Sequence, residues 1–132
     1  MVISEPFEVE FDEGRHHRAK IGFVLLATEQ TIEDDMYHLL PDGIGIHFTR
    51  TPIPDSITAE TLTDLADSLG DAAALLLPDG SLDVITYGCT SGSLVVGEDR
   101  VFKELNSGAP SALTTSLITS VLRALAVIDA KR

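Results

Sequence analysis

Apolar and polar positions along the chain alternate between short strand-like runs and longer helix-like segments. Residues 21–27 form one continuous apolar run, the pattern of a strand buried on both faces of a parallel sheet, and we expect it to be the central strand. Residues 44–50 alternate in part and predict a second strand, and residues 82–87 predict a third. Residues 109–115 fit either a short strand or a loop.

Four segments have the apolar spacing of helices. They cover residues 31–40, opened by Thr31, then 58–77, 94–105 and 115–127. Gly70 lies inside the second segment and either bends or breaks it, whereas we expect the third to continue despite Gly97. Strand-to-helix units in succession predict an α/β fold, a doubly wound, mostly parallel sheet flanked by helices.

The chain divides into a polar arm, residues 1–19, and a single α/β domain, residues 20–132. In the arm, Val9 and Phe11 fit an edge strand as well as an unstructured tail. The adjacent His16 and His17 point different ways, so we expect a solvated pair and no metal site. The strand–helix alternation stops after a helix, which indicates a fragment or a sheet completed by another chain.

Composition narrows the classes of function. The 132 residues suit one domain, and 9 basic against 21 acidic residues give a net charge of −12, which argues against a nucleic-acid surface. The first residues lack the basic and apolar regions of a signal peptide, and we find no apolar run long enough to span a bilayer. A single cysteine excludes an intrachain disulfide framework. We therefore expect a cytoplasmic protein that binds neither nucleic acid nor membrane.

The only cysteine, Cys89, follows the third predicted strand and precedes a helix. Open α/β sheets bind their ligands at the carboxyl ends of strands. Thr90, Ser91 and Ser93 supply hydroxyls and candidate helix caps beside it. The amino end of the following helix would face the sulfur and favour the thiolate, the nucleophilic form.

A structural interpretation of the same residues stays open. Cysteine is often a small buried hydrophobe, so Cys89 fits the core as well as a reactive site. We expect Arg50 to form a surface ion pair and His47 to be structural. Asp83 is expected to cap a turn, and Tyr87 to lie in the core.

Four motifs together resemble the aspartate/glutamate racemase superfamily, in the branch that holds maleate cis-trans isomerase, arylmalonate decarboxylase and the racemase-like proteins of ectoine utilisation. The motifs are Ile21-Gly22-Phe23-Val24-Leu25-Leu26, Gln30-Thr31-Ile32-Glu33, His47-Phe48-Thr49-Arg50 and Tyr87-Gly88-Cys89-Thr90-Ser91-Gly92-Ser93. The resemblance covers residues 20–128, and the cysteine turn is its most specific part. Members of the superfamily have two similar flavodoxin-like halves, each contributing one cysteine or its substitute; this sequence resembles the first half.

The resemblance implies the residues of a site. Cys89 would be the first-half cysteine, acting as base or nucleophile. Contacts to the substrate would come from two turns, through Thr28, Gln30, Thr31, Thr90 and Ser91. The superfamily works without a metal or other cofactor, so none is expected here.

The resemblance also implies a reaction class. It is that of a cofactor-independent racemase or cis-trans isomerase of a small carboxylate, incomplete without a second half. The decarboxylases have glycine in place of the first cysteine, so Cys89 favours isomerase chemistry. The alternative is a non-catalytic α/β module that binds a ligand or pairs with itself, because the second half is missing. A homo-oligomer is therefore among the expected partners.

Overall fold

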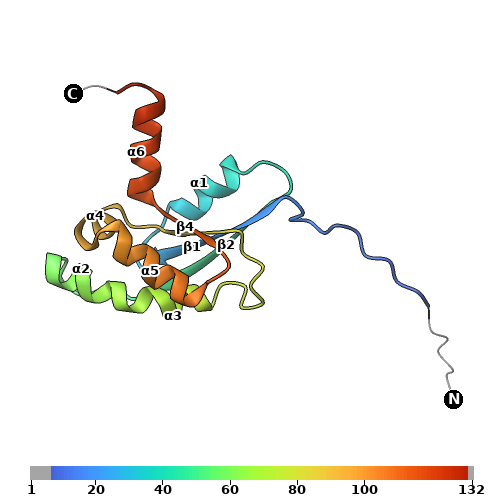
Figure 1. The fold of residues 1–132 in the computed structure, drawn as a ribbon, viewed down its shortest axis with the longest axis horizontal. Helices are drawn as coiled ribbons and strands as arrows, with labels where there is room; N and C mark the ends of the chain where they lie inside the picture. The colour runs from blue at the N-terminus through green and yellow to red at the C-terminus, as the bar shows by residue number, and fades with distance from the viewer. Residues whose placement is uncertain (1–6, 131–132) are drawn as a thin grey trace, which may run out of the picture.

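A four-stranded sheet forms the centre of the computed structural model, which describes residues 7–130 (Figure 1). Its strands are β1 (Ala19–Leu26), β2 (Ile44–Thr51), β3 (Val84–Tyr87) and β4 (Leu113–Ser116). They pair in the order β2-β1-β3-β4, and every pairing is parallel. The prediction of a central first strand is confirmed, since β1 lies between β2 and β3. Of the two alternatives for residues 109–115, the strand is the one observed.

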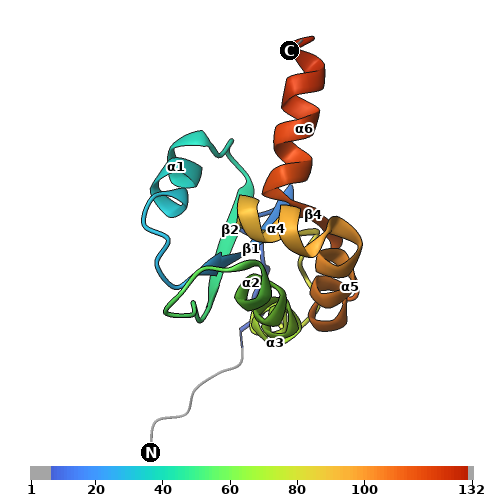
Figure 2. The ribbon, with the colours of Figure 1, turned by 90° about the vertical axis from the view of Figure 1, so that its left-hand side faces the viewer.

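Helices cover both faces of this sheet, which confirms the doubly wound α/β class (Figures 1 and 2). The helices are α1 (Ile32–Leu39), α2 (Ala59–Leu65), α3 (Leu69–Ala74), α4 (Thr90–Val96), α5 (Glu98–Gly108) and α6 (Leu117–Val127), with a 3₁₀ turn η1 (Ala66–Ser68). The main core lies on one face, where Val24 and Ile85 pack with Leu69, Val101 and Leu105, all fully buried. The core is mostly aliphatic.

The second predicted helix is divided into three pieces. Thr58 caps α2, its Oγ1 accepting the backbone N–H of Thr61 at 3.1 Å. The break comes at η1, before Gly70, and α3 ends at residue 74, not 77. Gly70 itself lies against α5, because a Cβ placed on Gly108 would collide with the Gly70 carbonyl oxygen. It therefore allows close helix packing.

The third predicted helix is wrong in two respects. Gly97 ends α4 and separates it from α5, because its φ of +86° lies in the region that favours glycine. In addition, α4 begins at Thr90, earlier than predicted. The last helix follows the prediction closely: α6 begins at Leu117, with Ser116 Oγ accepting the N–H of Thr119 at 3.2 Å.

The segment before the sheet has no regular structure. Residues 7–18 contain neither helix nor strand. His16 packs on His47 of β2, and the chain before it runs away from the sheet (Figure 1), so Val9 and Phe11 do not form an edge strand. The parts of the predicted arm and domain at residues 1–6 and 131–132 lie outside the described residues. Across residues 7–130, every helix is too short or too polar to cross a bilayer.

Candidate active site

The turns that follow β1 and β3 meet at one edge of the sheet. The N–H of Gly88 donates to the carbonyl of Val24 at 2.8 Å, which joins the ends of the two strands. A Cβ placed on Gly88 would lie 3.6 Å from Cδ1 of Ile32, the first residue of α1. The turn that carries Cys89 therefore adjoins the start of α1, as parallel strands require.

Cys89 is itself the N-cap of α4. Its Sγ accepts the N–H of Gly92 at 3.2 Å and lies 3.7 Å from Oγ of Ser91. Its carbonyl accepts the N–H of Ser93 at 3.0 Å and the hydroxyl of that residue at 2.7 Å. The side chain is only 6% exposed, whereas Thr90 and Ser91 are exposed. The sulfur thus meets a helix amide, as predicted, and also packs at the border of the core.

Tyr87 packs beside the sulfur. The residue is 1% exposed, which confirms its prediction as core. A Cβ placed on Gly92 would lie 2.7 Å from the Tyr87 hydroxyl and 3.0 Å from Sγ of Cys89, so the three residues pack closely. Burial raises the pKa of Tyr87 far above its ordinary value, and the neighbouring Cys89 adds a smaller effect in the same direction. The hydroxyl has no hydrogen-bond partner among the described residues, and its proton stays on the oxygen at neutral pH.

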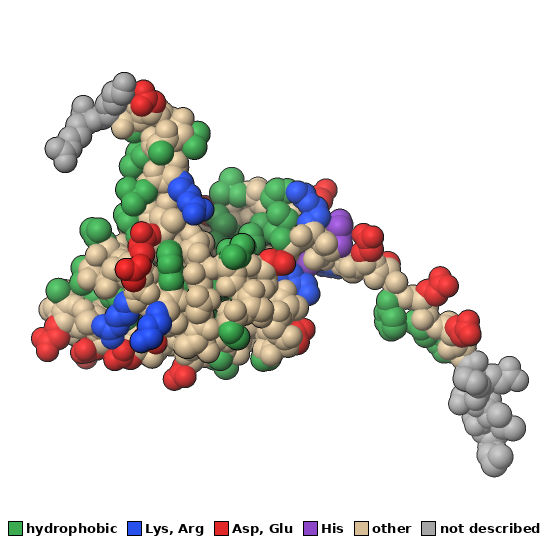
Figure 3. Space-filling view, in the orientation of Figure 1, with side chains coloured by type: hydrophobic (Ala, Val, Ile, Leu, Met, Phe, Trp, Pro, Cys, Tyr) green, Lys and Arg blue, Asp and Glu red, His purple; other side chains and the backbone are tan. Residues whose placement is uncertain are grey.

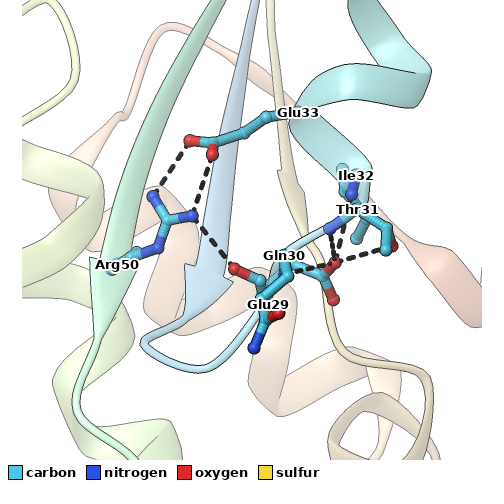
Figure 4. Close-up of polar contacts among 6 residues, drawn as sticks. All are labelled: Glu29, Gln30, Thr31, Ile32, Glu33 and Arg50. Carbon is cyan, nitrogen blue, oxygen red and sulfur yellow. Dashed lines mark hydrogen bonds and ion pairs between the residues drawn. The ribbon is translucent and has the colours of Figure 1, made fainter.

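The turn after β1 is closed by a residue that the sequence did not single out (Figure 4). Oε1 of Glu29 accepts the N–H groups of Gln30, Thr31 and Ile32 at 2.9, 2.7 and 3.1 Å, and the Thr31 hydroxyl at 2.9 Å. These hydrogen bonds lower the pKa of Glu29, and the bond from the Thr31 amide has the largest effect. The carboxylate of Glu29, and not Thr31, therefore caps α1, and it occupies donors assigned by resemblance to a substrate.

Arg50 ties this turn to β2. Its guanidinium binds both carboxylate oxygens of Glu33, at 2.9 and 3.0 Å, and the Glu29 carbonyl at 3.2 Å (Figure 4). The hydrogen bond from Arg50 lowers the pKa of Glu33. The prediction of a surface ion pair is confirmed. Thr28 and Gln30 are exposed on the same turn.

The remaining polar candidates lie in structural positions. His47 packs against His16, with ring centroids 5.7 Å apart, and burial lowers the pKa of His47. Asp83 precedes β3 and accepts the N–H of Lys20 at 2.8 Å. Within residues 7–130, no three His, Cys, Asp or Glu side chains gather as metal ligands.

A third strand end carries polar groups that sequence reasoning missed. Ser116 ends β4, is fully buried, and its hydroxyl lies 3.4 Å from the Glu98 carboxylate, which the Thr119 hydroxyl also contacts. The signal for Ser116 was present, since a serine directly before an apolar helix is a common N-cap. The signal for Glu29 was weaker, because glutamate is not a favoured cap.

Solved structures share this fold. The chain is similar to maleate isomerase Iso from Pseudomonas putida S16, at 16% identity over 86% of this chain and 51% of that one, with a TM-score of 0.66. It is similar to a Nocardia farcinica maleate cis-trans isomerase mutant with a covalently bound succinylcysteine intermediate, at 25% identity over 86% and 50%, TM-score 0.70. A liganded arylmalonate decarboxylase double mutant, with one glycine replaced by cysteine and one cysteine by serine, matches at 21% identity over 84% and 47%, TM-score 0.60.

These matches define the fold and its extent. No protein-family model and no curated protein sequence matches the chain. The chain spans about half the length of the structures it matches. It therefore has the α/β fold of one half of maleate isomerase and arylmalonate decarboxylase.

Proposed function

We propose that this chain is a cofactor-independent, cysteine-based isomerase of a small carboxylate, with Cys89 as the reacting group. One observation carries the proposal: Sγ of Cys89 accepts an amide N–H at the amino end of α4, at the carboxyl end of a parallel strand. An amide donor and the helix dipole both stabilise negative charge on sulfur. The fold shared with half of maleate isomerase supports this assignment.

Cis-trans isomerisation is the reaction that one thiol can complete. The thiolate adds to one carbon of a double bond, and the π electron pair moves toward the adjacent carboxylate as an enediolate. Rotation then follows about the former carbon–carbon double bond, which is now a single bond. The electron pair then re-forms the double bond and expels the thiolate. No proton is gained or lost, and the chain has one cysteine, so we favour this reaction over racemisation.

Racemisation would need more than this chain contains. A base must take the proton from one face of the carbon, and an acid must return one on the other face. With Cys89 on one face, the second group would have to come from another chain or from a second half. We therefore keep a racemase of the same class only as a variant of this proposal.

The carboxylates of the substrate would bind neutral donors on the two turns. The exposed hydroxyls of Thr90 and Ser91 lie next to Cys89 in sequence, and Thr28 and the side-chain amide of Gln30 lie on the adjoining turn. Such donors stabilise the developing enediolate charge. Thr31 can donate to the substrate only when the Thr31 amide and hydroxyl are released from the Glu29 carboxylate.

A non-catalytic module is the second candidate. It is favoured by the 6% exposure of Cys89 and by the Glu29 carboxylate, which already occupies the amides of the neighbouring turn. In that case the cysteine is a structural cap, and the chain binds a ligand or a second copy without turnover.

Conversion of maleate to fumarate, followed by proton NMR, separates the two candidates. We expect fumarate to form with the wild-type chain and not with Cys89→Ser. Ser91→Ala should raise KM. Ser111→Ala removes an exposed hydroxyl near the amino ends of the strands, away from Cys89, and should have no effect. A wild-type rate equal to that of Cys89→Ser would contradict the enzymatic proposal.

A further inference from the structure

One face of the sheet is only partly covered. On this face α1 packs against β2, with the rings of Tyr37 and Phe48 5.9 Å apart. Beside α1, a groove of about 360 Å³ passes over β1, β3 and β4 to the foot of α6. It is lined mainly by apolar side chains, among them Ile21, Phe23, Met36, Val84 and Leu117, with Asp35 as its acidic residue.

Helix α6 is the second uncovered surface. It stands out from the body of the molecule (Figure 1), and apolar side chains lie along it (Figure 3). Ile118, Val121, Leu122 and Leu125 form a stripe at helical spacing, and every residue from 120 to 130 is exposed. An unsupported helix of 11 residues is marginal in water. We therefore infer that this apolar stripe packs against a partner.

The charges of the two surfaces are complementary. Arg123 is the one charged residue of α6, in a chain whose net charge is −12. Among the described residues, neither the Arg123 guanidinium nor the Asp35 carboxylate forms a hydrogen bond or ion pair. A basic residue on an apolar helix and an acidic residue in an apolar groove are thus both left without a partner.

The helix cannot fill the groove of its own chain. Leu117 and Ser120, in the first turns of α6, line the groove, so the helix starts there and leads out of it. Its exposed stripe could return only if the helix broke. A second copy, in contrast, can present its α6 to this groove and receive α6 of the first copy in its own groove. Such an arrangement is symmetric and doubles the buried apolar surface.

We propose that two copies of this chain form a symmetric dimer in which α6 of each lies in the groove of the other. The Leu122 side of the stripe enters the groove, and Arg123 pairs with Asp35 of the other copy. The residues proposed to bind substrate do not line this groove. The dimer therefore goes beyond the proposed function and is tested independently of it.

Light scattering coupled to size exclusion, over a range of concentrations, tests the dimer. We expect the wild-type chain to be a dimer and the double variant Leu122→Asp, Leu125→Asp to be a monomer that still unfolds cooperatively and whose far-UV circular dichroism loses no more than the helical signal of α6. Leu75→Asp is the matched control, because Leu75 is 74% exposed and follows α3, which packs on the opposite face of the sheet. This control should remain a dimer.

A charge exchange tests the predicted register. Asp35→Arg and Arg123→Asp should each raise the dissociation constant by about tenfold or more, because each puts like charges together at both reciprocal contacts. The two substitutions combined should restore the affinity of the wild-type chain. A wild-type monomer at every concentration, a double aspartate variant that remains dimeric, or a charge exchange without recovery would each overturn the proposal. In the first case the groove is left for another segment or partner.

Discussion

Two helix amino ends, those of α1 and α4, lie side by side at one edge of the sheet but are capped differently. At α1, the carboxylate of Glu29 accepts three backbone N–H groups and a hydroxyl. At α4, the sulfur of Cys89 accepts one N–H. The chain supplies the charge at α1 itself, whereas at α4 it places a group that can form and break covalent bonds. The α1 turn thus has its amides occupied by its own carboxylate, whereas the α4 turn holds the sulfur that we propose as the reacting group.

The two turns are also held by different forces. Hydrogen bonds and the ion pair of Arg50 with Glu33 hold the α1 turn near the surface. The α4 turn is held by packing, because Tyr87, Gly92 and Cys89 lie together and buried. A change that disturbs packing at α4 should therefore cost more stability than the loss of the polar cap at α1.

Gly92→Ala should give the largest effect on stability. The new Cβ would lie 2.7 Å from the Tyr87 hydroxyl and 2.9 Å from its ring, and that ring is too buried to move freely. Overpacking of this kind costs about 1–3 kcal/mol. Urea unfolding measures the loss, and Ser91→Ala, on the exposed side of α4, should stay within about 0.5 kcal/mol of wild type. Equal stability of the glycine and alanine proteins would show that the α4 turn is looser than described.

Glu29→Ala should have the second-largest effect and lower the free energy of unfolding by about 1 kcal/mol, the usual cost of losing a helix cap. Glu29→Gln keeps a side-chain oxygen that can accept the same N–H groups, so it should lose less. Thermal unfolding of the three proteins under one buffer condition measures the order. If glutamine costs as much as alanine, the carboxylate acts through its charge alone.

The contribution of Glu29 should depend on pH. Its pKa is lowered in the fold from an ordinary value of 4.5, so the stabilisation is fully present above that pH and is lost as pH falls through the folded-state value. The stability difference between wild type and Glu29→Ala should therefore shrink below about pH 4.5. A difference that stays constant into acid would contradict the role of the ionised carboxylate.

Tyr87→Phe should have the smallest effect at neutral pH. The hydroxyl has no partner to lose, so we expect a change of about 0.5 kcal/mol or less. Because the pKa of Tyr87 is raised in the fold, its contribution is full below the ordinary value of 10 and falls as pH rises above it. Alkaline unfolding should therefore begin at higher pH in Tyr87→Phe than in wild type, and identical alkaline curves would contradict this.

The strands were predictable because their signal is long and continuous. The apolar run of β1 and the short run of β3 indicate burial wherever they lie in the fold. Helix ends were harder. The start of α4 at Thr90 has no apolar periodicity, and Gly97 gives no sign in sequence that its φ will be positive.

The candidate site was predictable in part for a related reason. The position of Cys89 at a strand end follows from the motif itself. The cap formed by Glu29 does not, because a long flexible side chain reaches the amides only once the turn has formed, and Thr31 has the stronger local preference for capping. Periodicity likewise predicted α6 but not that its apolar stripe would lie uncovered, since periodicity says nothing of the partner.

Labelling of Cys89 by iodoacetamide in the folded chain, followed by intact mass with and without maleate, tests most directly whether this sulfur is the reacting group. We predict that the sulfur is alkylated while the protein remains folded and that maleate slows the reaction, because both reagents need the same thiolate. Labelling that begins only when denaturant unfolds the chain, and that maleate does not change, would mean that Cys89 is a structural cap and not a reacting group.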